Sequence, residues 1–538
     1  MAKLNPQDMI EELRYDIKNE DPLKAQIVLS YIDKVDGNTQ KKLLFAIVQA
    51  DSAFSIPLLA FLLSEYPQLN QEFPILKETL VSNILSDLDF FMKLLGNPNS
   101  SGKTIYIIIA GEIGFIKGLD IIVDILLGTE DQSIIVECIN TLGLLGDASI
   151  TNILTDYLYS GNREITMTVV KAMGQISSPT SMHRLAERMG TDNEIDMLIL
   201  EIFSKVQDNL SLEKINESIQ SHYAHIRNFA KNAMVTIGTK AVPLLTDNLK
   251  YDDPDLIIHS LNILGDIGDA SAIMPVRKLL NSEPRDANIR FAAYEALALL
   301  PLKKGAYILT DGLTDPVKSV RLAAAKAIEK NYDAILTAGI KNLVKAKDED
   351  TNKIIKAIIN AHTDKIFLSL VEEDCFKKIA AMYMPKAHPD TQTHFKELLI
   401  KEGYGKYASQ IILSKEESNA IKIFVVDDSR MILNIFKSTL HELGFNPLLF
   451  EFPASALDAL DIEKPDIILT DLNMPDITGI DLTEKVRLKH SKEDLPIIMV
   501  TTQNEKNDNE AAFKAGVNKI IHKPFDADMI KNAISEFI

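Results

Sequence analysis

The chain has 538 residues, of which 57 are Lys or Arg and 76 are Asp or Glu, so its formal net charge is −19 at pH 7. This acidic balance disfavours nucleic acids and anionic membrane surfaces as partners, because binding to either depends largely on Lys and Arg. Apolar runs such as residues 105–110 are far shorter than the ~18 residues that a membrane-spanning helix requires.

The N-terminus and the cysteine content both favour the cytoplasm. The first residues lack the apolar stretch and the small-residue cleavage site of a secretory signal. The only cysteines are Cys138 and Cys375, in apolar helical surroundings that predict buried packing residues in a reducing compartment. We therefore expect a cytoplasmic protein with no membrane insertion.

Residues 1–404 show the apolar spacing of helices, and Asp21-Pro22 predicts an early helix start. A glycine recurs after an apolar helical pattern at Gly111, Gly143, Gly174, Gly238 and Gly265. The first two spacings are 32 and 31 residues, and the third is 64, or two units. Such a fixed period predicts a repeat architecture.

An arginine that enters an Ala-rich helix keeps the same period. Arg227 and Arg290 are 63 residues apart, and Arg290 and Arg321 are 31 apart. Asp315-Pro316 predicts a capped helix with Pro at its first position, followed by apolar residues on one face. Each unit is therefore predicted to be a helix, a turn and a second helix, which must stack on its neighbours to bury its apolar face.

These markers resemble HEAT repeats of the short bacterial type, with their Asp-Pro-x-x-x-Val-Arg signature, over about residues 105–332. The resemblance implies an all-α, right-handed superhelical solenoid over residues 1–404. Residues 1–104 and 333–404 are then degenerate or capping repeats. In this repeat type the arginine ties one repeat to the next.

Residues 405–420 are rich in Gly, Ser and charge, which predicts a linker. Short β-rich apolar runs then alternate with helical patterns, and this alternation predicts a doubly wound α/β domain over residues 421–538. Its five parallel strands are predicted at 421–426, 448–450, 466–470, 496–500 and 518–521, with helices at 430–443 and 480–490.

Polar residues follow the predicted strands at their carboxyl ends, where doubly wound sheets bind ligands. These residues are Asp427, Asp428, Asp471, Thr501, Thr502 and Lys523. Clustered carboxylates repel one another and favour a hard divalent cation such as Mg²⁺. One carboxylate can then act as a nucleophile toward a phosphoryl group, with the metal and the lysine neutralising its oxygens.

The same residues, in the order Asp427-Asp428-Ser429, Asp471-Leu472-Asn473-Met474-Pro475, Thr501-Thr502 and Lys523-Pro524, resemble the receiver domains of two-component response regulators. The resemblance implies a flavodoxin-like fold with Asp471 as the phosphoacceptor. It implies Mg²⁺ on the side chains of Asp428 and Asp471 and on the backbone carbonyl of Asn473.

Further roles follow from the same resemblance. Asp427 helps to hold a metal-bound water, Lys523 and Thr501 contact the phosphoryl group, and the Lys523-Pro524 peptide is cis. The phosphodonor is a histidine kinase or a phosphotransfer protein. One position departs from the family pattern, since Ile520 replaces the usual Tyr or Phe of the rotamer switch. Two outcomes stay open: the signal passes instead through the loops after Thr501 and the helix at 505–515, or switching is weaker.

These observations predict a cytoplasmic response regulator whose Mg²⁺-dependent phosphorylation alters protein–protein contacts of the receiver and the solenoid, with no DNA-binding output. It is expected to be a signalling protein, not an enzyme, catalysing only its own phosphoryl transfer and dephosphorylation. The partner of the solenoid is not predicted. Two alternatives stay open: a scaffold with a phosphate-insensitive receiver, and a lyase-like protein acting on a chromophore or a protein, because HEAT-like repeats also occur in phycobilin lyases.

Overall fold

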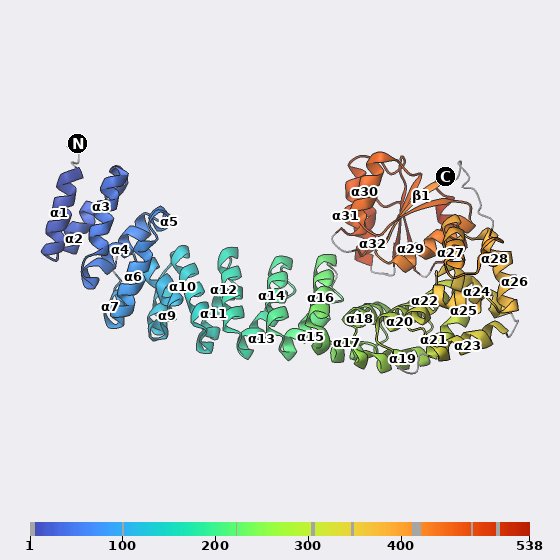
Figure 1. Ribbon diagram of the computed structural model, residues 1–538. Helices are drawn as coiled ribbons and strands as arrows, with labels where there is room; N and C mark the ends of the chain where they lie inside the picture. The colour runs from blue at the N-terminus through green and yellow to red at the C-terminus, as the bar shows by residue number, and fades with distance from the viewer. Residues whose placement is uncertain are drawn as a thin grey trace. The chain divides into compact units, whose positions relative to one another are not determined.

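The structure, a computed structural model, describes residues 6–538 except 99, 101, 222, 303–306, 346–348, 412–420, 475–476, 502–505 and 524; it does not describe the side chains of 224, 349, 430, 431 and 506–508. The chain divides into two compact parts, Met1–Ser211 and Leu212–Ile538 (Figure 1). None of the described helices is both long enough and apolar enough to cross a membrane.

The first part consists of helices. They are α1 (Pro6–Lys18), α2 (Pro22–Leu29), α3 (Gly37–Val48), α4 (Ser52–Glu65), α5 (Gln68–Glu72), α6 (Ile75–Ser86), α7 (Leu88–Gly96), α8 (Lys103–Glu112), α9 (Leu119–Gly128), α10 (Gln132–Leu145), α11 (Thr151–Leu158), α12 (Arg163–Ile176), α13 (Pro179–Arg188) and α14 (Asn193–Val206). Short 3-10 helices are η1 (Ile32–Lys34), η2 (Ile116–Gly118) and η3 (Ala148–Ile150). The predicted start of α2 is confirmed, because the Asp21 carboxylate accepts a hydrogen bond from the backbone N–H of Lys24 at 3.2 Å.

The helices continue up to residue 408, and the first of them, α15, spans the boundary between the two parts. They are α15 (Asn209–Ser218), α16 (Ala224–Ile237), α17 (Val242–Asn248), α18 (Pro254–Ile267), α19 (Ile273–Asn281), α20 (Ala287–Leu299), α21 (Ile308–Asp311), α22 (Lys318–Lys330), α23 (Ala334–Lys345), α24 (Glu349–Asn360), α25 (Asp364–Leu370), α26 (Asp374–Tyr383), α27 (Pro389–Lys401) and α28 (Gly405–Ala408), with η4 (Gly238–Ala241), η5 (Ala270–Ala272), η6 (Gly312–Thr314) and η7 (Met384–Lys386). The predicted linker thus begins with a short helix, and residues 412–420 lie outside the described residues.

Close approach between neighbouring helices explains the recurring glycine. The helices α10, α12 and α14 stand side by side (Figure 1), and a Cβ on Gly143 would lie 2.7 Å from the Cα of Ala172 on the next helix. A Cβ on Gly265 of α18 would lie 3.1 Å from the Cα of Ala296 on α20. Gly238 plays a different part, because it ends α16 with a φ of +72° that a residue with a side chain rarely adopts. Glycine therefore marks the period mainly because a side chain would force adjacent repeats apart.

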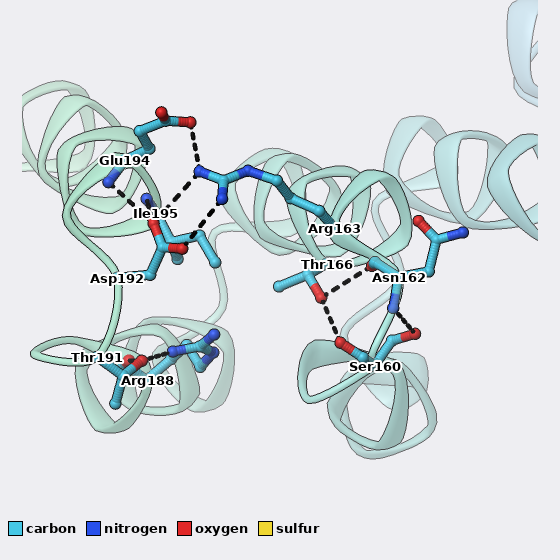
Figure 2. A network of polar contacts seen from close by, with 9 residues as sticks. All are labelled: Ser160, Asn162, Arg163, Thr166, Arg188, Thr191, Asp192, Glu194 and Ile195. Carbon is cyan, nitrogen blue, oxygen red and sulfur yellow. Dashed lines mark hydrogen bonds and ion pairs between the residues drawn. The ribbon is translucent and has the colours of Figure 1, made fainter.

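Polar residues at the repeat turns both cap helices and link repeats. Figure 2 shows Arg163, at the start of α12, reaching Asp192 at 3.3 Å and also Glu194 in the next repeat. Asp192 in turn caps α14 by accepting from the backbone N–H of Ile195 at 3.2 Å. Asn162 caps α12 in the same way, through the N–H of Glu164 at 2.9 Å.

The arginine marker has two uses. Arg290 on α20 forms an ion pair of 2.8 Å with Asp315 of the following repeat, which confirms the predicted tie at this position. Arg321 donates to the backbone carbonyl of Asp315 at 2.5 Å, in the turn before its own helix. The predicted helix start at Asp315-Pro316 was wrong: Asp315 accepts from the N–H of Val317 at 2.8 Å, so this turn extends to Val317 and α22 begins at Lys318.

The two cysteines differ in burial. Cys138 on α10 is buried, as predicted, but Cys375 on α26 is only partly buried. The prediction was therefore wrong for Cys375, which lies in the first turn of its helix, where one side meets solvent.

The C-terminal domain is built on a five-stranded parallel sheet, as predicted. Its elements are β1 (Lys422–Val426), α29 (Arg430–Glu442), β2 (Asn446–Phe450), α30 (Pro453–Ile462), β3 (Ile467–Thr470), α31 (Gly479–Arg487), β4 (Ile497–Thr501), α32 (Lys506–Ala515), β5 (Lys519–His522) and α33 (Ala527–Ile534). The strand order is β2-β1-β3-β4-β5, a doubly wound order with its switch point between β1 and β3. Apolar residues of the inner strands, such as Phe424 and Ile468, pack against α30 and α31.

Candidate functional site

The register of the parallel strands brings the predicted polar residues to one edge of the sheet. Val426 at the end of β1 lies beside Thr470 at the end of β3, so Asp427 and Asp471 follow from adjacent strand ends. On the other side, Thr501 of β4 lies beside His522 of β5, which places Lys523 directly beyond that pair. This is the switch-point edge at which the sequence predicted a ligand site.

Lys523 bridges two of the carboxylates. Its Nζ lies 2.7 Å from Oδ2 of Asp427 and 3.0 Å from Oδ1 of Asp471. The exposed fractions of these side chains are 10% for Lys523, 2% for Asp427 and 12% for Asp471, so the ion pairs are shielded from solvent. Ion pairs of this kind interact strongly, but each charge has lost its hydration.

The charges at the edge are not balanced. Burial raises the pKa of Asp427, and the Asp471 carboxylate adds to this effect while Lys523 opposes it. Burial and the same Asp471 carboxylate raise the pKa of Asp428 to about 6. For Lys523 burial alone would lower the pKa, but Asp427 and Asp471 raise it overall, so the ammonium stays charged. Lys523 contacts two of these three carboxylates, Asp427 and Asp471, and further positive charge would stabilise the ionised forms of all three.

A tight loop holds Asp471 in place. The backbone N–H of Gly479 donates to the carbonyl of Leu472 at 2.9 Å, and a Cβ on Gly479 would lie only 2.1 Å from the carbonyl oxygen of Asp471. The N–H of Asn473 donates to Oδ2 of Asp471 at 3.2 Å. The structure thus gives the reason for a glycine at this position, since any side chain would push the Asp471 backbone aside.

The donors at this edge fit a magnesium ion. Among the described residues, no three His, Cys, Asp or Glu side chains lie close enough together to hold a metal as they stand. Magnesium, however, usually takes one or two carboxylates and keeps several waters. Asp428 and Asp471 with the carbonyl of Asn473 meet this requirement, and the uncompensated negative charge favours it.

The remaining predicted residues lie around this cluster. Thr501 is buried at the end of β4. Ile520 is partly buried against an apolar cluster that contains Leu472 and Met499, so an aliphatic side chain packs where the family usually has a ring. Thr502 and Pro524, with its predicted cis peptide, lie outside the described residues.

Helices of the repeats also line the site. The sequence analysis did not predict this contribution. A cavity of about 400 Å³ is lined by Asp427, Asp428, Asp471, Asn473 and Lys523 of the sheet domain and by residues of α16, α18, α20 and α22. The side-chain amide of Asn288 on α20 donates to the backbone carbonyl of Lys523. Ser429 Oγ lies 3.5 Å from Oε1 of Glu295, whose pKa burial and the Asp427 charge raise to about 8. The helical period identifies buried faces, but it gives no signal of which repeat surface faces another domain.

Helix α29 carries the second set of contacts between the sheet domain and the repeats. Glu442 lies 3.3 Å from Nζ of Lys318 on α22 and accepts a hydrogen bond of 2.8 Å from the hydroxyl of Tyr383 on α26. Lys437 forms an ion pair with Asp390 of α27. The rings of His441 and His388 meet edge to face, with their centroids 4.8 Å apart.

Comparison with known proteins finds a family match within each of the two regions. The family model of the response regulator receiver domain matches residues 423–535, and that of HEAT repeats matches residues 119–201 and 242–329. The chain is 41% identical over 120 residues to a chemotaxis protein CheY homolog of Campylobacter jejuni, covering 22% of this chain and 92% of that protein. It is 40% identical over 116 residues to chemotaxis protein CheY1 of Helicobacter pylori, covering 21% of this chain and 94% of that protein. Among solved structures, CheY4 of Vibrio cholerae is 25% identical, with a TM-score of 0.22 and coverage of 22% of this chain and 99% of that chain.

Proposed function

Since the chain belongs to the response-regulator receiver family through its C-terminal domain, we propose that Asp471 accepts a phosphoryl group in a Mg²⁺-dependent reaction. The observation that carries this proposal is the buried cluster in which Lys523 bridges Asp427 and Asp471 at the switch-point edge. A buried carboxylate with a raised pKa, here Asp427, that shares a lysine with a second carboxylate in a cavity is typical of a functional site.

In the proposed reaction a carboxylate oxygen of Asp471 attacks phosphorus, and the phosphorus–nitrogen bond of a phosphohistidine on a histidine kinase or phosphotransfer protein breaks. The imidazole leaves with the bonding pair and takes up a proton. Lys523 neutralises developing charge on the phosphoryl oxygens, and Thr501 donates a hydrogen bond to the product. Bound Mg²⁺, held by Asp428, Asp471 and the Asn473 carbonyl with Asp427 orienting a water, would supply further charge neutralisation.

The output we propose is a change in protein contacts. The phosphorylation edge faces a cavity lined by repeat helices, so a phosphoryl group, which adds about −1.5 to −2 charge at pH 7, alters the electrostatics of that contact. The net charge of −19 supports a protein partner on the solenoid over a nucleic acid.

Labelling with acetyl phosphate and Mg²⁺, followed by intact mass measurement, tests the assignment. We expect one phosphoryl group per chain in the natural protein and none in Asp471→Asn, because an amide is not a nucleophile toward phosphorus. Asp458→Asn, a change at an exposed position on α30, is the matched control and should label normally. Persistent labelling of Asp471→Asn would overturn the proposal.

One observation favours a second candidate, a scaffold with a phosphate-insensitive receiver. Ile520 occupies the position of the usual switch aromatic and packs in an apolar cluster with Met499, so no ring can turn there. Hydrogen exchange with Mg²⁺ and beryllofluoride, a mimic of the phosphoryl group, separates the two functions. If exchange changes only near Asp471, Thr501 and Lys523 and nowhere else in the chain, the result would support the scaffold.

A further inference from the structure

Among the described residues of the repeats, one unpaired cation, Lys231, lies at the proposed phosphorylation site. Lys231 on α16 lines the 400 Å³ cavity together with Asp428 and Asp471. In the part of the chain that the structure describes, no hydrogen bond or ion pair engages its ammonium, whereas Lys523 across the cavity is bound to two carboxylates. A partly buried ammonium without a bound anion is costly and is best explained by a charge that arrives in another state of the protein.

The surroundings of Lys231 support a role in binding an anion. Burial and the nearby Arg227 lower the pKa of Lys231 to about 8, while Asp471 and Asp428 act in the opposite direction. The field of the phosphorylation edge therefore already reaches this ammonium. Added negative charge at Asp471 would favour the charged form further.

Lys231 is also the sole Lys or Arg that the repeats contribute to the described lining of the cavity. The other ionisable repeat residues there are Asp266, Glu295 and His259. Burial raises the pKa of Asp266 and of Glu295, and burial lowers that of His259. Because these shifts all favour neutral forms, Lys231 is the repeat residue suited to meet a phosphoryl dianion.

We propose that Lys231 binds the phosphoryl group of Asp471 from the repeat side, so that phosphorylation strengthens the contact between α16 and the receiver domain. Asn288, which already donates to the backbone of Lys523, holds the same edge from α20. The phosphoryl group would then sit between Lys523 of the receiver and Lys231 of the repeats. This inference rests on the proposed phosphorylation of Asp471, and it adds a residue of the repeats to that site.

The test uses full-length protein with Mg²⁺ and beryllofluoride. The apparent affinity for beryllofluoride is measured by titration, with hydrogen exchange of α16 as the readout. We expect Lys231→Gln to weaken binding about tenfold or more, the effect of losing a charged hydrogen bond. Lys231→Arg should retain most of the affinity, and Lys250→Gln, at an exposed lysine paired with Asp247, should match the natural protein.

The outcomes distinguish this inference from the function on which it rests. If the natural protein shows no beryllofluoride response at all, the proposed phosphorylation is overturned, and this inference with it. If it responds but Lys231→Gln binds beryllofluoride equally well, this inference alone is overturned. Faster exchange of α16 on binding would also overturn it, because phosphorylation would then loosen the contact. Exchange without beryllofluoride checks that the variant folds as the natural protein does.

Discussion

Two ion-pair networks, one in the repeats and one in the receiver domain, each join one basic side chain to two carboxylates, but they differ in burial. Arg163 meets Asp192 and Glu194 in a network whose side chains are 29% to 74% exposed (Figure 2). Lys523 meets Asp427 and Asp471 with side chains that are 12% exposed or less. Water screens the first network, so it orients repeat turns at little energetic gain. The second network is shielded from water, and a shielded cluster with unbalanced charge is typical of a functional site.

The largest expected effect comes from removing the buried cation. Lys523→Met keeps most of the stem but leaves Asp427 and Asp471 without their partner. We expect the free energy of unfolding of the receiver domain to fall by about 3–5 kcal/mol without Mg²⁺. Millimolar Mg²⁺ should restore more stability to the variant than it adds to the natural protein, because the ion replaces the missing positive charge.

Hydrogen exchange of β1 and β3 measures the stability of the receiver domain separately. A single melting curve cannot do so, because the chain has two compact parts. The control is Lys464→Met, which removes a surface pair with Asp494 and should change little. An equal gain from Mg²⁺ in both proteins would contradict the expected balance of charge.

Glycine substitutions probe close packing in both regions. Gly479→Ala should destabilise the receiver domain by about 1–3 kcal/mol and disturb Asp471, because the new Cβ would overlap its carbonyl. Gly143→Ala should destabilise the α10–α12 contact by a similar amount. Gly128→Ala, at the end of α9 with open space around the new Cβ, should cost nothing. Urea unfolding followed by hydrogen exchange compares the three, and equal stability would disprove the packing argument.

The stability lost on removing an arginine that links two repeats should be larger where its ion pair is more buried. Arg290→Ala leaves Asp315, whose side chain is 8% exposed, without its partner, and we expect a loss of about 2 kcal/mol. Arg163→Ala breaks an exposed network and should cost clearly less. Local hydrogen exchange in α20–α22 and in α12–α14 reads each change. A larger loss at Arg163 would show that burial does not rank these links.

The smallest expected effect is a pH dependence of the α27–α29 contact. Burial, with Lys437, lowers the pKa of His388 to about 4, while Asp390 opposes the shift and His441 adds to it. The contact therefore favours neutral His388, so its stabilisation is complete above the ordinary His pKa of about 6.5 and is lost as the pH falls toward 4. After allowance for solvent screening we expect less than about 1 kcal/mol between pH 7 and 5.5.

Hydrogen exchange of α29 across this pH range checks the prediction. His388→Asn is the control, because it keeps an acceptor for the backbone N–H of Asp390 at the start of α27 and removes the titrating ring. If the natural protein and the variant respond alike to pH, another group is responsible.

The sequence by itself determined the two architectures and which charged residues of the sheet domain meet at its switch-point edge. Helical periodicity, the recurring glycine and the alternation of strands and helices are local signals, so they predicted the repeats and the parallel sheet. The carboxyl ends of parallel strands must share one edge, and for this reason Asp427, Asp471 and Lys523 could be placed together in advance.

Only the tertiary structure decided which repeat surface faces that edge. Lys231 and Asn288 lie on helices far from the sheet domain in sequence, and nothing in their local pattern differs from a solvated helix position. The start of α22 was misplaced because Asp315 accepts from the N–H of Val317 in a turn before the helix, and the same carboxylate pairs with Arg290 of the preceding repeat, a contact that local capping rules do not include. Contacts between distant helices and strands depend on how their whole surfaces fit together. The spacing of apolar residues in the sequence indicates only which positions are buried.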